Sequence, residues 1–538
     1  MTETASAPRV ARSSAIIGMG TLLSRITGFL RVSALVALGA SRLTDVYNLA
    51  NSTPNIVYEL LLGGILTATL VPLFVESHER DDPGATDAIN TVAIVMLVAG
   101  TVVGVVAAPW IFRAYVDLAD VHHGVSRTAQ ITLGTDLLRW FMPQMLFYGI
   151  TALATAMLNA RRRFAAAAFA PALNNIVVIT MLLVVGRIAS ATPTPRSVLD
   201  DPVLVLLLGL GTTAGVIAMT LVLLPALRRA GTGFRWRWEP RHPAVRTLAR
   251  LSSWTVGYVA TNQLAFIVVL VLAYRHDGDA TLYFAAFTFF QLPHGLLAVS
   301  VMTALGPELA SRHQAGDRAG LRDHFGRGLN MILIVMIPAA VGLAVLATPL
   351  ITALLAHGKF NHASVTETAN TLRAFAVGLV GFSVYLYVIR VFSSMKNTRV
   401  PFFLNLIENG VNVATAFLLY EWRGVEGLAW SWTVAYFVGA IVALGALRVR
   451  LVRLGGRSLV STAVRVSVAT IPAALAAVAV TAAMGSASPS SAVVTLLAAT
   501  AAGGALFVGC GRLVGFDLIA LLRGIVRRED RSAALPDA

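Results

Sequence analysis

Long runs of apolar residues recur along the whole chain, and short polar segments separate them. Each run is long enough for a helix to cross about 30 Å of hydrocarbon at about 1.5 Å per residue. The pattern predicts an all-α polytopic membrane protein with about fourteen transmembrane helices. We place the spans at 13–38, 43–76, 86–113, 128–158, 165–187, 202–227, 244–273, 279–309, 325–355, 367–394, 401–420, 425–447, 463–484 and 491–512.

Similar segments in the two halves of the chain predict an internal duplication. Leu138-Arg139-Trp140-Phe141 recurs as Leu372-Arg373-Ala374-Phe375, and Asn174 matches Asn409 at nearly the same offset. Transporters with such repeats bind substrate between the halves, so we expect two six-helix repeats around a central cavity, plus two C-terminal helices. The predicted domains are an N-terminal lobe at 1–228, a C-terminal lobe at 229–457, the extra helices at 458–512 and a basic tail at 513–538.

Charge and composition exclude several classes of protein. Hydrophobic residues make up 57% of the chain and charged residues 13%, which excludes a soluble enzyme with one large core. The net charge of +15 comes largely from arginines in alternate loops, which places both termini in the cytoplasm and argues against nucleic acid as a partner. Cys510 is the only cysteine, so neither an internal disulfide nor a thiolate metal site is possible.

The first apolar segment carries Ser24, Arg25 and Arg31. An arginine at membrane depth costs about 3 kcal/mol on insertion scales, so such a residue usually faces a wet cavity or a polar substrate. Gly28 lies between the arginines and permits a bend that would turn both inward. We expect a cationic lining that holds phosphate; the alternative is that each side chain reaches the headgroups along its aliphatic stem.

The second span adds Asp45, Asn48, Asn51, Asn55 and Glu59. Asp45 is either a counter-ion to one of the arginines, part of an ion-coupling step, or a cap at the start of the span. The asparagines share one helical face, where they line the cavity or bond to neighbouring helices. Glu59 lies deeper, and we expect it to pair with an arginine across the cavity.

A second polar cluster lies in span 11, at Asn405, Glu408, Asn409 and Asn412. A carboxylate with amide oxygens can coordinate Na⁺, and the carboxylate alone can carry a proton. The alternative is a polar contact between helices. No nucleotide-binding signature occurs, so we expect no cofactor, and transport must depend on Na⁺ or H⁺ coupling or on the membrane potential.

Several motifs together resemble the MurJ/MviN lipid II flippases of the multidrug/oligosaccharidyl-lipid/polysaccharide exporter superfamily. The resemblance covers nearly all of the first 450 residues and rests on Ser24 to Arg31, Thr44-Asp45, Pro54-Asn55, Leu70-Val71-Pro72, Leu292-Pro293-x-Gly295, His357-Gly358-Lys359-Phe360, Val377 to Gly381 and Lys396 to Pro401. It implies a bacterial cytoplasmic-membrane transporter, not an enzyme, that moves lipid II (the undecaprenyl-pyrophosphate-linked peptidoglycan precursor) to the outer leaflet by alternating access.

The resemblance also implies roles for particular residues. Arg25 and Arg31 correspond to family cavity arginines, and Asp45 and Asn55 to further family positions. Two family arginines are missing, because Tyr58 and Thr288 stand in their places. The two extra C-terminal helices would hold the lipid tail.

We therefore expect Ser24, Arg25, Arg31, Asp45, Asn55 and Glu59 to contact lipid II, with membrane lipids and cell-wall synthesis and division proteins as further partners. Two alternatives remain open. A cation-coupled multidrug exporter of the same superfamily should prefer acidic cavity residues. A membrane scaffold for cell-wall enzymes would not need the arginines.

Overall fold

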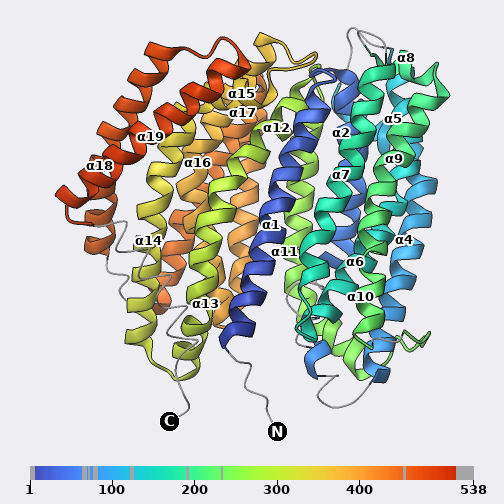
Figure 1. Ribbon diagram of the computed structural model, residues 1–538. Helices are drawn as coiled ribbons and strands as arrows, with labels where there is room; N and C mark the ends of the chain where they lie inside the picture. Colours follow the sequence, from blue (N-terminus) through green and yellow to red (C-terminus); the bar gives the residue numbers. More distant parts are fainter. Residues whose placement is uncertain are drawn as a thin grey trace. The chain divides into compact units, whose positions relative to one another are not determined.

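The computed structural model describes residues 7–63, 70, 73–76, 83–120, 126–189, 193–231, 234–451 and 456–516. Within these residues the chain is helical, with no strand. It divides into two compact units, Met1–Thr281 (unit 1) and Leu282–Ala538 (unit 2), and Figure 1 shows the helices of each unit running lengthwise beside one another. Most of the proposed basic tail lies outside the described residues.

Unit 1 contains α1 (Ala7–Val36), α2 (Arg42–Tyr58), the π-helix η1 (Glu59–Gly63), α4 (Pro83–Leu118), α5 (Arg127–Phe141), α6 (Pro143–Ala160), α7 (Ala165–Ile188), α8 (Pro195–Leu199), α9 (Pro202–Leu221), α10 (Leu224–Arg229) and α11 (Pro243–Ala273). Helix α12 (Asp279–Pro293) begins in unit 1 and continues into unit 2. Unit 2 then contains the π-helix η2 (His294–Ala298), α13 (Val299–Gln314), α14 (Arg318–Val345), α15 (Ala347–Leu355), α16 (His362–Ser394), α17 (Arg399–Leu451), α18 (Gly456–Met484) and α19 (Pro489–Leu513).

The described residues include twelve helical segments that are long and apolar enough to cross a membrane. One of them, α17, merges two of the predicted spans across a kink at Gly424, which has φ of 57°. Helix α2 is not among the twelve, and part of the predicted second span lies outside the described residues. A polytopic helical membrane protein is confirmed, and the count of fourteen stays a prediction.

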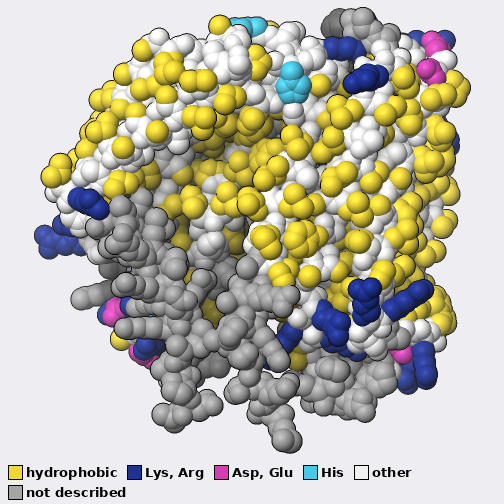
Figure 2. All heavy atoms as spheres, in the orientation of Figure 1, with side chains coloured by type: hydrophobic (Ala, Val, Ile, Leu, Met, Phe, Trp, Pro, Cys, Tyr) yellow, Lys and Arg dark blue, Asp and Glu magenta, His cyan; other side chains and the backbone are white. Residues whose placement is uncertain are grey.

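The surfaces of the helices fit a lipid environment. On α4, the side chains of Val103, Val106 and Trp110 are exposed although all three are large and apolar. Figure 2 shows the same on the visible face of unit 1, where hydrophobic side chains cover the middle and Lys and Arg gather toward the two ends. Such continuous apolar surfaces are unstable in water and are expected where helices meet lipid.

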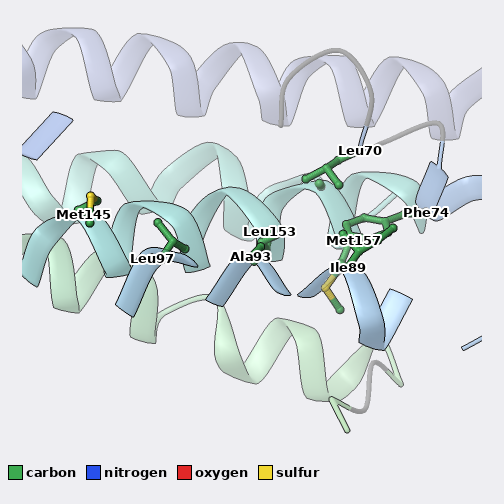
Figure 3. Packing of buried hydrophobic residues seen from close by; sticks show 9 residues of the cluster. Leu70, Phe74, Ile89, Ala93, Leu97, Met145, Leu153 and Met157 are labelled. Atoms are coloured by element: carbon green, nitrogen blue, oxygen red, sulfur yellow. The ribbon is translucent and has the colours of Figure 1, made fainter. Parts of the chain in front are cut away.

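The interior of unit 1 includes a close contact between α4 and α6. Leu97 of α4 and Met145 and Leu153 of α6 are buried there, together with Leu70 and Phe74 from the segment before α4 (Figure 3). Apolar burial of this kind sets the spacing of the helices that carry the polar side chains described below.

Equivalent contacts in the two units support the internal duplication. Thr213 donates a hydrogen bond to the carbonyl oxygen of Trp140 at 2.7 Å in unit 1, and Thr433 does the same to Ala374 at 2.7 Å in unit 2. In both units a π-helical turn follows a proline-containing segment, at η1 and at η2. The predicted lobe boundaries themselves stay a prediction.

Candidate functional site

Helix α1 carries both arginines of the first span. It is helical from Ala7 to Val36 without interruption, so the bend that Gly28 permits does not occur. Six residues of regular helix separate Arg25 from Arg31, which turns their side chains about 120° apart and displaces them by about 9 Å along the axis. Arg25 is exposed and Arg31 is half-buried.

The orientation of α1 is held by α7. The side-chain amide of Asn175 donates to the carbonyl oxygen of Ser24 at 3.2 Å and to the hydroxyl of Thr27 at 3.1 Å. Gly20 permits a close approach lower on the same helix, because a Cβ there would lie 2.6 Å from the Cβ of Ala168. Sequence reasoning missed Asn175; an asparagine in a strongly apolar span was the signal that could have identified it.

Arg31 interacts electrostatically with an aromatic side chain of α6. It lies within electrostatic range of the Tyr148 hydroxyl, and the ring of Tyr148 lies 6.1 Å from that of Tyr58. Tyr148 in turn donates to the side chain of Gln144 at 3.4 Å. Tyr58, at a position where the family resemblance implies an arginine, therefore contributes to a polar aromatic surface on this side of unit 1.

Glu59 follows directly as the first residue of η1 and is half-buried. The ion pair that we expected between Glu59 and an arginine is not observed among the described residues, where neither Glu59 nor Arg25 nor Arg31 has an oppositely charged partner within 4.0 Å. On α2, one turn before Glu59, the side chain of Asn55 is exposed.

The remaining asparagines of α2 have other environments. Asn48 donates to the hydroxyl of Thr281 at 3.1 Å, which is a contact with the start of α12. The side-chain oxygen of Asn51 is buried and has no hydrogen-bond partner among the described residues. Of the three asparagines on this face, Asn55 is therefore the one whose side chain is open to a ligand.

Asp45 is fully buried and belongs to an anchor between α2 and the beginning of α12. Its carboxylate accepts hydrogen bonds from the backbone N–H of Gly278 at 2.6 Å, from the backbone N–H of Thr281 at 2.9 Å and from the Thr281 hydroxyl at 2.8 Å. Helix N-termini present unpaired N–H groups, and Gly278 has no side chain with which to cap them. Asp45 thus caps α12 from another helix.

The cation that acts on Asp45 is Arg42, not Arg25 or Arg31. The Arg42 guanidinium is 3% exposed, forms an ion pair with Asp277 and donates to the carbonyl oxygen of Tyr274. It also lies 4.5 Å from the centre of the Tyr274 ring. The charged neighbour of Asp45 is therefore not an arginine of α1, and its carboxylate caps α12 and not the start of its own helix.

The second polar cluster lies in unit 2 on α17. The carboxylate of Glu408 is 1% exposed and accepts a hydrogen bond from the Asn409 amide at 2.8 Å. Asn409 also donates to the carbonyl oxygen of Asn405 at 3.0 Å. Asn412 accepts from Ser431 at 3.1 Å, which joins the two arms of α17 across its kink.

The four residues of this cluster divide into two groups. Asn412 makes the polar contact between helical segments that was the alternative expectation. Glu408, Asn409 and Asn405 form a compact group with one buried carboxylate. Among the described residues, no set of three acidic, histidine or cysteine side chains could hold a metal ion.

The geometry of unit 1 suits recognition of an anion. Arg25 and Arg31 offer two separate guanidinium groups on one helix. The second interacts electrostatically with Tyr148, whose ring lies 6.1 Å from that of Tyr58. Guanidinium groups bind phosphate through paired N–H donors.

Known proteins share this fold and this sequence pattern. The family model "Lipid II flippase MurJ" matches residues 35–501. The chain is 29% identical over 432 residues to "Lipid II flippase MurJ" of Burkholderia cenocepacia, covering 78% of this chain and 79% of that protein. It is 28% identical over 448 residues to "Probable lipid II flippase MurJ" of Bdellovibrio bacteriovorus, with 82% of each covered.

Solved structures agree on the fold. "Lipid II flippase MurJ, inward closed conformation" has a TM-score of 0.72 at 20% identity and covers 91% of this chain and 98% of its own. An inward-facing multidrug resistance MATE family transporter of the MOP superfamily has a TM-score of 0.64 at 12% identity, covering 84% of this chain and 99% of its own. Because the family model spans most of the chain, this protein belongs to the MurJ family, whose members are membrane transporters and not enzymes.

Proposed function

We propose that this protein moves lipid II, the undecaprenyl-pyrophosphate-linked peptidoglycan precursor, from the inner to the outer leaflet of the bacterial cytoplasmic membrane by alternating access. The observation that carries the proposal is the pair of arginines on α1, neither of which has an acidic partner among the described residues. Family membership supports the substrate, because the matching relatives are named lipid II flippases.

The spacing of the arginines indicates how the pyrophosphate is held. A displacement of about 9 Å along α1, with a turn of about 120°, is too large for both guanidinium groups to grip one phosphoryl group. Arg25 and Arg31 therefore contact the anion at successive depths. The hydroxyl groups of Tyr58 and Tyr148 supply hydrogen bonds beside Arg31, where a further family arginine is missing.

Ser24 and Asn55 complete the substrate contacts on α1 and α2, and Glu59 shapes the polar lining without neutralising either arginine. Asp45 contributes differently, by fixing α2 to the start of α12. Since its carboxylate is enclosed by three donors, it does not contact substrate in this state.

Glu408 is the residue that we propose for ion coupling. A buried carboxylate among amides costs free energy unless it binds a cation or a proton, and the described cluster contains no arginine or lysine. Asn405 and Asn409 lie beside it, and Asn412 fixes the kinked helix on which all four stand. Na⁺ and H⁺ are the two candidates.

Helices α18 and α19 would hold the polyprenyl tail. Their outward side chains, including Ile471, Leu475 and Leu497, are exposed and apolar. The arginine-rich loops support a cytoplasmic location for both termini. There the termini would be available to cell-wall synthesis and division proteins.

The test measures lipid II that a membrane-impermeant probe can reach at the outer surface after the protein is depleted from its host. Wild-type protein restores this signal, Arg25→Ala and Arg31→Ala do not, and Arg163→Ala in the exposed loop before α7 restores it fully. Expression of every variant is matched by immunoblot.

Other outcomes select other functions. If depletion leaves outer lipid II unchanged in a host without a second flippase, transport of lipid II is excluded. If wild-type and both arginine variants restore growth equally while loop deletions do not, the scaffold alternative replaces it.

A further inference from the structure

The segment between α10 and α11 forms an extended arm of alternating aromatic and basic residues. It reads Phe234-Arg235-Trp236-Arg237-Trp238 and has no helical or sheet structure. Successive side chains of an extended segment point to opposite sides, so the aromatic residues share one side and the arginines the other. The T-shaped contact between Phe234 and Trp236, with ring centres 6.4 Å apart, agrees with this arrangement.

The backbone of the arm is fixed to α4. The N–H of Arg235 donates to the Asp87 carboxylate at 3.1 Å, and the N–H of Arg237 donates to the Thr91 hydroxyl at 3.0 Å. Two extended residues span about 6.7 Å, and four helical residues about 6.0 Å, so the two spacings match. The arm therefore runs alongside α4 in the same direction and is attached to it through its backbone. The Arg237 guanidinium pairs with Glu239 of the same segment at 2.9 Å.

The attachment places the arm at the level of the lipid headgroups. Helix α4 has 36 residues and is about 54 Å long, which exceeds the hydrocarbon thickness by about 24 Å, or about 12 Å at each end if centred. Asp87 and Thr91 lie about 6 and 12 Å from its first residue. The arm thus begins among the headgroups and ends at the edge of the hydrocarbon.

The side chains of the arm have the chemistry of that layer. Phe234, Trp236 and Trp238 are 48%, 63% and 53% exposed, which is unfavourable in water but typical of aromatic residues at a membrane interface. Between residues 228 and 246 the chain has six exposed arginines against the single acidic residue Glu239. Figure 2 shows Lys and Arg side chains gathered at the lower end of unit 1, the end at which α10 lies in Figure 1.

We propose that this arm is a binding site for anionic phospholipids, with the aromatic side inserted at the headgroup boundary and the arginines bound to lipid phosphates. The site anchors unit 1 to one leaflet at the N-terminal end of α4. On the orientation proposed above, that leaflet is the cytoplasmic one. The proposal depends on α4 crossing the bilayer and not on the transported substrate, so it can fail or hold independently of lipid II transport.

The test uses full-length protein in lipid nanodiscs. In a Cys510→Ala background, a cysteine at position 234, 236 or 238 carries an environment-sensitive fluorophore, and Arg163→Cys in an exposed loop of the same unit is the control. We expect blue-shifted emission at the three arm positions. A headgroup nitroxide should quench position 234 most strongly and a shallow acyl-chain nitroxide position 238, because the arm runs inward along α4.

The anionic preference is measured by comparing quenching by nitroxide-labelled phosphatidylglycerol and phosphatidylcholine. We expect a ratio above one for the parent arm, falling by up to about fivefold in Arg235→Gln and by less in Arg237→Gln, because the Arg237 guanidinium already pairs with Glu239. The proposal is overturned if iodide quenches the arm positions as strongly as the control while lipid nitroxides do not. It is also overturned if lipid quenching appears only after lipid II is added, since the arm would then be a substrate contact.

Discussion

Asp45→Asn tests the anchor between α2 and α12. Asp45 accepts two backbone N–H bonds and one hydroxyl bond. Asparagine has nearly the same shape but only one acceptor oxygen, so its NH₂ group must face either Gly278 or Thr281. That backbone N–H is then buried without a partner.

The magnitude follows from the lost bond. A buried N–H left without a partner costs about 1–3 kcal/mol, which corresponds to about 5- to 150-fold in a local opening equilibrium. Hydrogen exchange by mass spectrometry on the full-length protein should show faster exchange by this factor in peptides covering 274–283. Peptides from α7 and α9 should not change.

Asp200→Asn is the matched control. Asp200 pairs with Arg196 at 3.3 Å, but the two side chains are 61% and 73% exposed, and such surface pairs contribute about 0–1 kcal/mol. In the Asp200→Asn variant, hydrogen exchange of the peptides around residue 200 should therefore change by less than about sixfold. Equal exchange in the 274–283 peptides of the parent and Asp45→Asn proteins would refute the capping argument.

Three further predictions concern other parts of the molecule. Gly20→Ala places a Cβ 2.8 Å from the backbone of α7 and should destabilise by about 1–3 kcal/mol, seen as a lower midpoint in thermal unfolding; Gly18→Ala, with open space around it, should not. The N–H of Gly320 and a neighbouring arginine lower the pKa of Asp317 from its ordinary 3.8, so the carboxylate stabilises this turn above about pH 4 and the contribution disappears as the pH falls through the lowered value. Acid-range hydrogen exchange at Gly320 should show this loss, and Asp317→Asn should remove the pH dependence. Glu408→Gln should abolish the dependence of lipid II exposure on Na⁺ or pH while expression is unchanged, and a persisting dependence would exclude Glu408 as the coupling group.

The order of the helices along the chain could largely be predicted, because lipid requires long apolar segments wherever a helix crosses it. A helix that crosses hydrocarbon needs a long apolar run, and α4 or α7 can be recognised from that alone. The duplication was also visible, because both halves keep a Leu-Arg-x-Phe motif where a threonine from another helix bonds to the backbone.

The site was less accessible to sequence reasoning, for reasons that differ from residue to residue. The hydrogen-bond partners of Asp45 lie in and just after the turn that follows α11. No local sequence pattern predicts that this turn lies beside α2. Gly28 permits a bend but does not require one, and the contacts of Asn175 with α1 accompany a regular helix. The role of Tyr58 could not be predicted, because it depends on the neighbouring ring of Tyr148, which comes from another helix.

The charged groups of unit 1 separate into those that hold the fold and those that remain available. Arg42 and Asp277 satisfy each other, and the bonds of Asp45 fix the end of α12, so their removal should disturb structure. Arg25 and Arg31 have no such partner among the described residues, so binding an anion there breaks no internal ion pair. Such an arginine at membrane depth costs about 3 kcal/mol of insertion free energy. Because the fold does not use it, the simplest explanation is a ligand whose binding offsets this cost in each transport cycle. Arg25→Ala and Arg31→Ala should therefore lose transport without losing stability. If they lose stability and keep transport, these arginines hold the fold, as Arg42 does.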